Sequence, residues 1–87
     1  MSKSFSTVLA ALRALASRGE IPRDLAKREL GPDSTIDELG IDSLGKLALL
    51  TELEDRIDIA IGEGALQGLK TLGALALLVE RLAQVAS

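Results

Sequence analysis

The stretch Asp37-Glu38-Leu39-Gly40-Ile41-Asp42-Ser43-Leu44 leads into the helix around which this 87-residue chain is organised. Asp42 and Ser43 stand directly before apolar residues spaced three and four apart, which is typical of a helix N-cap. The apolar run consists of Leu44, Leu47, Leu50, Leu53 and Ile57. At 100° per residue, the opposite face, open to water or a partner, would hold Gly45, Ala48, Glu52, Asp55 and Arg56.

Two further helices are predicted, one before and one after this stretch. Phe5, Leu9, Leu12, Leu15 and Ala16 repeat with helical spacing, and Ser17-Arg18-Gly19 is a stop signal. Near the other end, Thr71 is expected to cap a last helix whose apolar face is Leu72, Leu75, Ala76, Val79, Leu82 and Ala83.

The connections between these helices carry weaker signals. Pro22 allows a short helical piece or a tethered loop after the first helix. Ser34 with Asp37, and Thr35 with Glu38, have capping-box spacing, which predicts one helical turn closed by Gly40. After residue 61, Gly62, Gly64 and Gly68 lower the helix propensity around the segment 65–67, where we expect one or two weak, mobile turns.

Together these elements predict one all-α domain over residues 1–87. It would be an antiparallel bundle of three main helices plus one short helix, with a long loop between the first two main helices. The expected core contains Leu9, Leu12, Leu15, Leu47, Leu53, Ile57, Leu72, Leu75, Val79 and Leu82.

Composition excludes several classes of function. Apolar residues make up 47% of the chain but aromatic residues only 1%, and Cys and His are absent. The sequence therefore offers no disulfide framework and lacks the commonest metal ligand and general base. Residues 31–87 are acidic, and without an aromatic platform they argue against nucleic acid. With no apolar stretch near 20 residues and no signal-peptide pattern, we expect a cytoplasmic monomer.

Ser43 is the residue whose side chain could take part in covalent chemistry. As a catalytic nucleophile it would need a base, and Lys46 on a small solvated helix has nothing to desolvate it, so hydrolysis by this chain alone is disfavoured. At a helix N-terminus, Ser43 could simply cap the helix, or it could carry a negatively charged group that the helix dipole stabilises.

Residues 37–44 resemble the Asp-Leu-Gly-x-Asp-Ser-Leu signature of acyl carrier proteins. The resemblance is specific over residues 34–82; residues 1–33 agree only in length and pattern. Downstream, Glu52-Leu53-Glu54-Asp55 is similar to the family's acidic helix end, Asp58-Ile59-Ala60-Ile61 to its extended link and Lys70-Thr71-Leu72-Gly73-Ala74 to the start of its last helix.

The resemblance implies that Ser43 carries 4′-phosphopantetheine, transferred from coenzyme A by a phosphopantetheinyl transferase. The arm would hold acyl or aminoacyl groups as thioesters and present them to a loading ligase and to downstream synthases or transferases. Asp42 would position the serine, and Leu44 would be an exposed docking contact. The implied partner-binding residues are Leu44, Gly45, Ala48, Glu52 and Asp55. Neither a catalytic residue nor a metal is implied.

Departures from the family keep alternatives open. Fatty-acid carriers are acidic just after the serine, whereas this chain has Gly45, Lys46 and Ala48 there. The difference favours a dedicated carrier in a specialised pathway over general fatty-acid synthesis. An aminoacyl or peptidyl carrier, or an unmodified helical adaptor that binds partners through its acidic face, remains an alternative.

Overall fold

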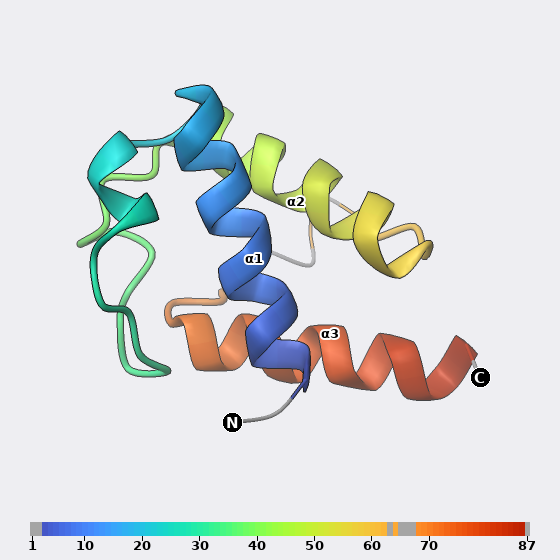
Figure 1. The fold of residues 1–87 in the computed structure, drawn as a ribbon. Helices are drawn as coiled ribbons and strands as arrows, with labels where there is room; N and C mark the ends of the chain where they lie inside the picture. Colours follow the sequence, from blue (N-terminus) through green and yellow to red (C-terminus); the bar gives the residue numbers. More distant parts are fainter. Residues whose placement is uncertain (1–2, 63, 65–67, 87) are drawn as a thin grey trace.

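The computed structural model describes residues 3–62, 64 and 68–86, and this part of the chain is helical, as predicted. Its elements are α1 (Lys3–Arg18), the 3₁₀ helix η1 (Arg23–Ala26), α2 (Ser43–Ile57) and α3 (Leu72–Ala86). The predicted long loop between the first two main helices is also present, with η1 inside it (Figure 1). No helix of the described residues combines the length and apolar character that a bilayer crossing requires.

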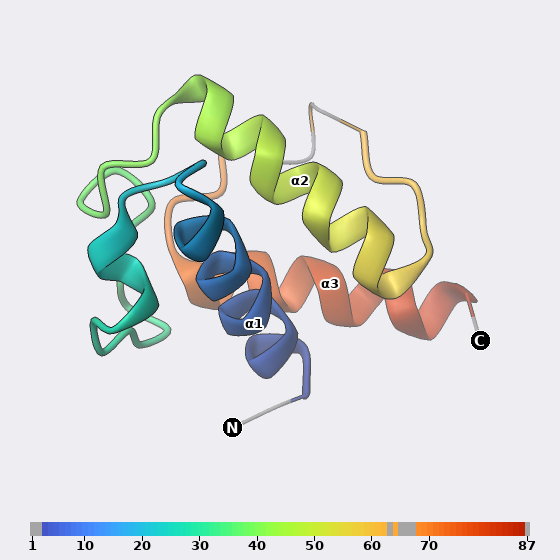
Figure 2. The ribbon, with the colours of Figure 1, turned by 45° about the horizontal axis from the view of Figure 1, so that its top comes forward.

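Helix α1 is the centre of the bundle. It packs against α2, α3 and η1; it runs roughly against the direction of α2 and crosses α3 obliquely (Figure 2). Of the predicted core, Leu12, Leu15, Leu53, Leu72, Leu75 and Val79 are buried, and Leu9, Ile57 and Leu82 are half-buried against that core. The long loop adds buried residues of its own: Ile21, Leu25, Leu30, Ile36, Leu39 and Ile41.

The predicted register of α2 is wrong at two positions. Leu47, expected in the core, is 45% exposed, and Gly45, expected to face water, is buried. The buried stripe of α2 is instead Gly45, Leu49, Leu50 and Leu53. Apolar residues occur almost all around the first two turns of this helix, so periodicity alone does not select one face. Packing against α1 and the loop makes that selection.

Gly45 faces the long loop, and the loop leaves no room for a side chain at this position. A Cβ atom at this position would lie 2.8 Å from Cγ2 of Ile41 and 3.2 Å from Cγ2 of Ile21. Both isoleucines are buried, and their branched side chains have little freedom to move. A glycine therefore lets the start of α2 approach the long loop closely.

One of the two predicted capping boxes forms in the loop. The Thr35 N–H donates to Oε1 of Glu38 at 2.9 Å, and the Glu38 N–H donates to Oγ1 of Thr35 at 3.1 Å. The box with Asp37 does not form, because Oγ of Ser34 accepts from the Gly31 N–H instead. Gly40 ends the turn with a φ of +75°, where glycine is favoured.

The same loop is fastened to the start of α3 by backbone hydrogen bonds. The Leu72 N–H donates to the Ser34 carbonyl, the Gly73 N–H to the Pro32 carbonyl and the Ile36 N–H to the Lys70 carbonyl, each at 2.9 Å. These bonds hold the loop across one end of the bundle and fix where residues 37–42 lead into α2.

At its other end, α2 stops at Asp58, which adopts a left-handed conformation with φ of 57°. The Glu54 carboxylate accepts a hydrogen bond from the N–H of Ile61, and Ile61 is buried. The link after α2 is thereby held against the helix. The weak turns predicted for 65–67 lie outside the described residues.

Candidate functional site

The site is the N-terminus of α2, where Asp42, one of the two predicted cap residues, is the N-cap. Oδ1 of Asp42 accepts a hydrogen bond from the Gly45 N–H at 2.7 Å, and the Asp42 carbonyl accepts from the Lys46 N–H at 2.8 Å. Asp42 has extended backbone geometry, as an N-cap residue requires. The cap fixes the direction in which α2 leaves the loop, and so fixes the position of the next residue.

Ser43 is the first residue of α2 and is exposed. Within the described residues, its hydroxyl group takes part in no hydrogen bond, and the N–H groups of Ser43 and Leu44 have no acceptor. The free N–H groups lie at the positive end of the helix dipole, beside the Asp42 carboxylate that caps the helix. The Ser43 oxygen is exposed, and these N–H groups can donate hydrogen bonds to an anionic group attached to it.

Lys46 does not convert Ser43 into a nucleophile. Its Nζ lies 3.7 Å from Oδ1 of Asp37, in an ion pair between two well-exposed side chains. No hydrogen bond joins this ammonium group to the Ser43 hydroxyl among the described residues. Among the described residues, no cluster of acidic side chains could hold a metal ion to activate the hydroxyl. This geometry suits a serine on which another enzyme acts.

An apolar surface begins beside Ser43 and follows the outer face of α2. Leu44 is 77% exposed and Leu47 is 45% exposed, which makes them the two large exposed apolar side chains of this helix. With Ala48 and Thr51 they line a shallow groove of about 680 Å³ between α2 and the end of α1. The remaining lining residues are the charged Arg18, Glu20, Glu52 and Asp55.

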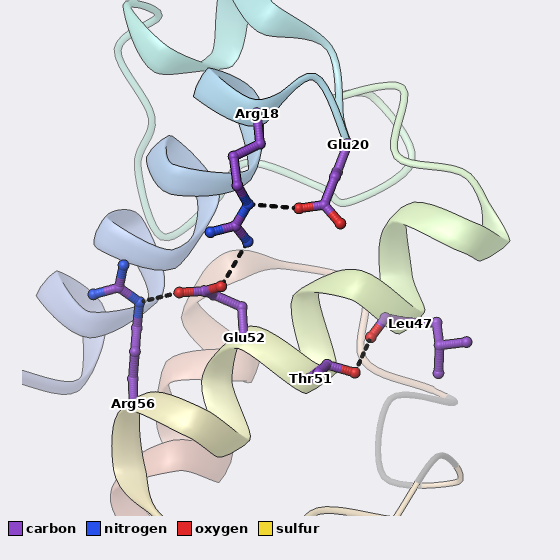
Figure 3. A network of polar contacts seen from close by, with 6 residues as sticks. All are labelled: Arg18, Glu20, Leu47, Thr51, Glu52 and Arg56. Carbon is purple, nitrogen blue, oxygen red and sulfur yellow. Dashed lines mark hydrogen bonds and ion pairs between the residues drawn. The ribbon is translucent and has the colours of Figure 1, made fainter.

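A network of ion pairs closes one side of this groove (Figure 3). Nη2 of Arg18 lies 2.7 Å from Oε1 of Glu52, and Nε of Arg56 lies 2.9 Å from Oε2 of the same carboxylate. Nε of Arg18 also contacts Oε2 of Glu20 at 2.7 Å. The hydrogen bond from Arg18 lowers the pKa of Glu52, although desolvation opposes the shift, and the same bond raises the pKa of Arg18.

The structure brings most of the sequence-predicted site residues together. Leu44, Ala48, Glu52 and Asp55 all line the groove, whereas Gly45 lies on the buried side of the helix. The groove also contains residues that were not predicted from the sequence: Arg18, Glu20, Leu47 and Thr51. Thr51 could have been found from its spacing of three from Ala48, which was predicted on the exposed face, but the position of Arg18 depends on how α1 packs against α2.

The residues around Ser43 fit a phosphopantetheine arm. The serine oxygen is exposed, the two free N–H groups beside it are suited to a phosphodiester, and the Asp42 oxygen nearest the helix is occupied by the Gly45 N–H. The neighbouring Leu44 is exposed and does not cover the hydroxyl.

Comparison with known proteins agrees with this geometry. The acyl carrier protein of Streptomyces coelicolor is 41% identical over 54 residues, which cover 61% of this chain and 59% of that protein. No solved structure matches the chain. Residues 20–79, more than half of the chain, match the family described as "Phosphopantetheine attachment site", whose members bind 4′-phosphopantetheine covalently. The chain therefore belongs to the family of phosphopantetheine-binding carrier domains.

Proposed function

We propose that this protein is an acyl carrier protein in which Ser43 carries the phosphopantetheine arm. The observation that supports this most directly is an exposed serine with a free hydroxyl at the uncovered N-terminus of α2, in a chain of this family. The arm supplies the thiol that the cysteine-free chain lacks. The chain itself provides an accessible oxygen and two N–H donors at a fixed place.

Each neighbouring residue has a distinct part in this proposal. Asp42 keeps the helix start in place through its bond to the Gly45 N–H, and so orients Ser43 for a transferase. Leu44, Leu47, Ala48 and Thr51 provide apolar surface beside the attachment point, with Glu52 and Asp55 further along the groove. The protein catalyses nothing itself; as a monomer it presents cargo to partner enzymes.

The proposed cargo is an acyl group held as a thioester, in a fatty-acid, polyketide or other specialised biosynthetic pathway. The name of the Streptomyces coelicolor relative supports acyl over aminoacyl cargo. The proposed partners are a phosphopantetheinyl transferase, a loading ligase and a downstream synthase or transferase. Offering candidate ligases fatty acids and amino acids in parallel would distinguish an acyl carrier from an aminoacyl carrier.

Intact-protein mass spectrometry tests the attachment site. The protein is incubated with coenzyme A, Mg²⁺ and a broad-specificity phosphopantetheinyl transferase, and the mass is compared before and after. We expect the mass of one phosphopantetheine group to be added to the wild type and to Ser17→Ala, but not to Ser43→Ala. Ser17 is the matched control because it is also an exposed serine at the end of a helix.

A folded wild-type protein that gains no mass would contradict the proposal. Such a result would favour the unmodified helical adaptor, in which Asp42 and Ser43 only begin a helix. Mass gain in Ser43→Ala would show that the arm is attached elsewhere.

A further inference from the structure

We infer that Lys46 binds the phosphate group of the arm on Ser43, and that attachment of the arm therefore releases Asp37 from its ion pair with Lys46. The inference rests on the proposed carrier function, because it concerns the group that Ser43 would hold. It makes Lys46 a positioning residue, since its ammonium group would keep the phosphate end of the arm at the first turn of α2.

The first observation is the position of Lys46 relative to Ser43. Ser43 is the first residue of α2, and Lys46 lies three positions further along the same helix. Residues three apart are neighbours on a helix surface, with Cβ atoms about 5–6 Å apart. The lysine side chain is long and flexible, and that of Lys46 is 42% exposed. Its ammonium group can therefore reach a phosphate attached to the Ser43 oxygen.

The second observation is that the present partner of Lys46 binds it weakly. Nζ of Lys46 lies 3.7 Å from Oδ1 of Asp37, whereas the other ion pairs between described residues have distances of 2.7–2.9 Å. The Asp37 side chain is 93% exposed. An ion pair between exposed side chains contributes little to stability. A phosphodiester beside Lys46 would therefore replace the Asp37 carboxylate at small cost.

The third observation is the carboxylate of Asp42 beside the attachment point. Asp42 directly precedes Ser43, and its Oδ1 accepts a hydrogen bond from the Gly45 N–H. A phosphodiester on Ser43 would add a second negative charge close to this carboxylate, and like charges repel. A cation on the same turn of the helix would offset that repulsion. Lys46 is the cationic residue of this turn.

Two arginines are the other cations near the start of α2. Arg18 is already bound to two carboxylates. Arg23 has no ion pair within the described part of the chain, and it lines a pocket of about 390 Å³ together with Asp42. Its guanidinium group, however, lies at the end of α1, where a Cβ atom on Gly19 would be 3.1 Å from Nη2 of Arg23. Lys46 shares a helix with the attachment residue, so the phosphate is assigned to Lys46.

Thermal unfolding of the apo and holo proteins tests this assignment. Intact mass first confirms that each sample is fully without or fully with the arm, and circular dichroism confirms that it is folded. Lys46→Gln is compared with Lys3→Gln, because Lys3 is also an exposed lysine in the first turn of a helix but lies at the start of α1. We expect the arm to raise the melting temperature by about 2 °C less in Lys46→Gln than in the wild type, and equally in the wild type and Lys3→Gln.

Two more variants separate binding of the phosphate from a purely structural role of Lys46. Lys46→Arg keeps the positive charge and should restore the wild-type effect of the arm. Asp37→Asn removes the competing carboxylate, so the arm should raise the melting temperature by about 1 °C more than in the wild type.

The phosphate itself provides a second readout. The ³¹P chemical shift of the phosphodiester in the holo protein should differ from the wild type in Lys46→Gln but not in Lys3→Gln. Raising NaCl from about 50 to about 500 mM should reduce the difference in melting temperature between wild type and Lys46→Gln by at least half, because salt screens an exposed ion pair.

Two results would overturn the inference. One is an equal effect of the arm on the melting temperatures of the wild type and Lys46→Gln. The other is a loss of that effect in Arg23→Gln with no change in Lys46→Gln, which would assign the phosphate to Arg23. These outcomes leave the carrier function intact, since Ser43 would still be modified. Failure of the wild type to gain the mass of the arm would instead contradict the proposed function.

Discussion

The starts of α2 and α3 both have a side-chain cap, but the long loop covers only the start of α3. Oδ1 of Asp42 accepts from the Gly45 N–H at 2.7 Å, and Oγ1 of Thr71 accepts from the Ala74 N–H at 3.1 Å, so each helix has a side-chain cap. At α3, the loop carbonyls of Ser34 and Pro32 also accept the first two N–H groups. At α2, the corresponding N–H groups have no acceptor among the described residues.

The residues that follow the two caps differ accordingly. Leu72 follows Thr71 and is completely buried, whereas Ser43 follows Asp42 and is exposed. The comparison shows that a capped helix start becomes an anchor when a loop covers it and an attachment site when it stays uncovered. The cap depends on neighbouring residues alone, whereas the exposure of the helix start depends on whether the loop covers it.

The largest expected difference between the two starts comes from changing the residue after each cap. Leu72→Ala should lower the free energy of unfolding by about 2–5 kcal/mol, because it empties part of the core, and should leave Ser43 able to accept the arm. Ser43→Ala should change stability by less than about 0.5 kcal/mol and abolish attachment. Urea unfolding and intact mass measure the two effects. Equal loss of stability in both variants would contradict the comparison.

The next effect concerns the glycine near each start. Gly45→Ala would place a Cβ 2.8 Å from Ile41 Cγ2, and Gly73→Ala would place one 3.0 Å from the Pro32 carbonyl oxygen. We expect each variant to lose about 1–3 kcal/mol of unfolding free energy through overpacking. Gly31→Ala is the control, because a Cβ at that position would meet nothing within 4 Å. Thermal or urea unfolding of the three variants would test whether both helix starts require close approach.

Removing the caps should have a smaller effect. Asp42→Ala and Thr71→Ala are each expected to cost about 1 kcal/mol, since each leaves one backbone N–H without its acceptor. Asp42→Ala should also slow phosphopantetheine transfer, because only the α2 cap positions Ser43. If Thr71→Ala slowed transfer equally, the two starts would not be functionally distinct. Urea unfolding and the initial rate of transfer provide the two readouts.

The smallest effect is expected from acid. The folded state lowers the pKa of Glu52 below its ordinary 4.5, chiefly through Arg18. The resulting stabilisation is present above pH 4.5 and is lost as the pH falls through the lowered value. Because these side chains are near the surface, we expect Arg18→Gln to reduce stability at pH 7 only slightly and to make the acid dependence shallower. The free energy of unfolding, measured from pH 7 to pH 3, tests this prediction. If it depended on pH in Arg18→Gln as it does in the wild type, the Arg18–Glu52 pair would not stabilise the fold.

Much of the site could be predicted from sequence because it depends on short-range interactions. The caps at Asp42 and Thr71, the Thr35–Glu38 capping box and the turn at Gly40 each involve residues within a few positions of one another. A side-chain cap acts on an N–H group two or three residues away, so the local pattern is sufficient to find it.

The register of α2 could not be predicted in the same way. Around Leu47 and Leu49, both sides of the helix are apolar, and the number of leucines does not indicate which side meets α1. Gly45 looked like part of a small exposed face, but it is where the helix and the loop approach most closely.

The sequence by itself determined the all-α class, the three main helices and the serine at a capped helix start, because these follow from local spacing. Only the tertiary structure decided that Arg18 pairs with Glu52, 34 residues away, and that the loop covers the start of α3 and leaves that of α2 open. The physical reason is that long-range contacts depend on how the helices pack around α1. On a helix that is apolar on several sides, more than one face could pack there, and the composition does not select one.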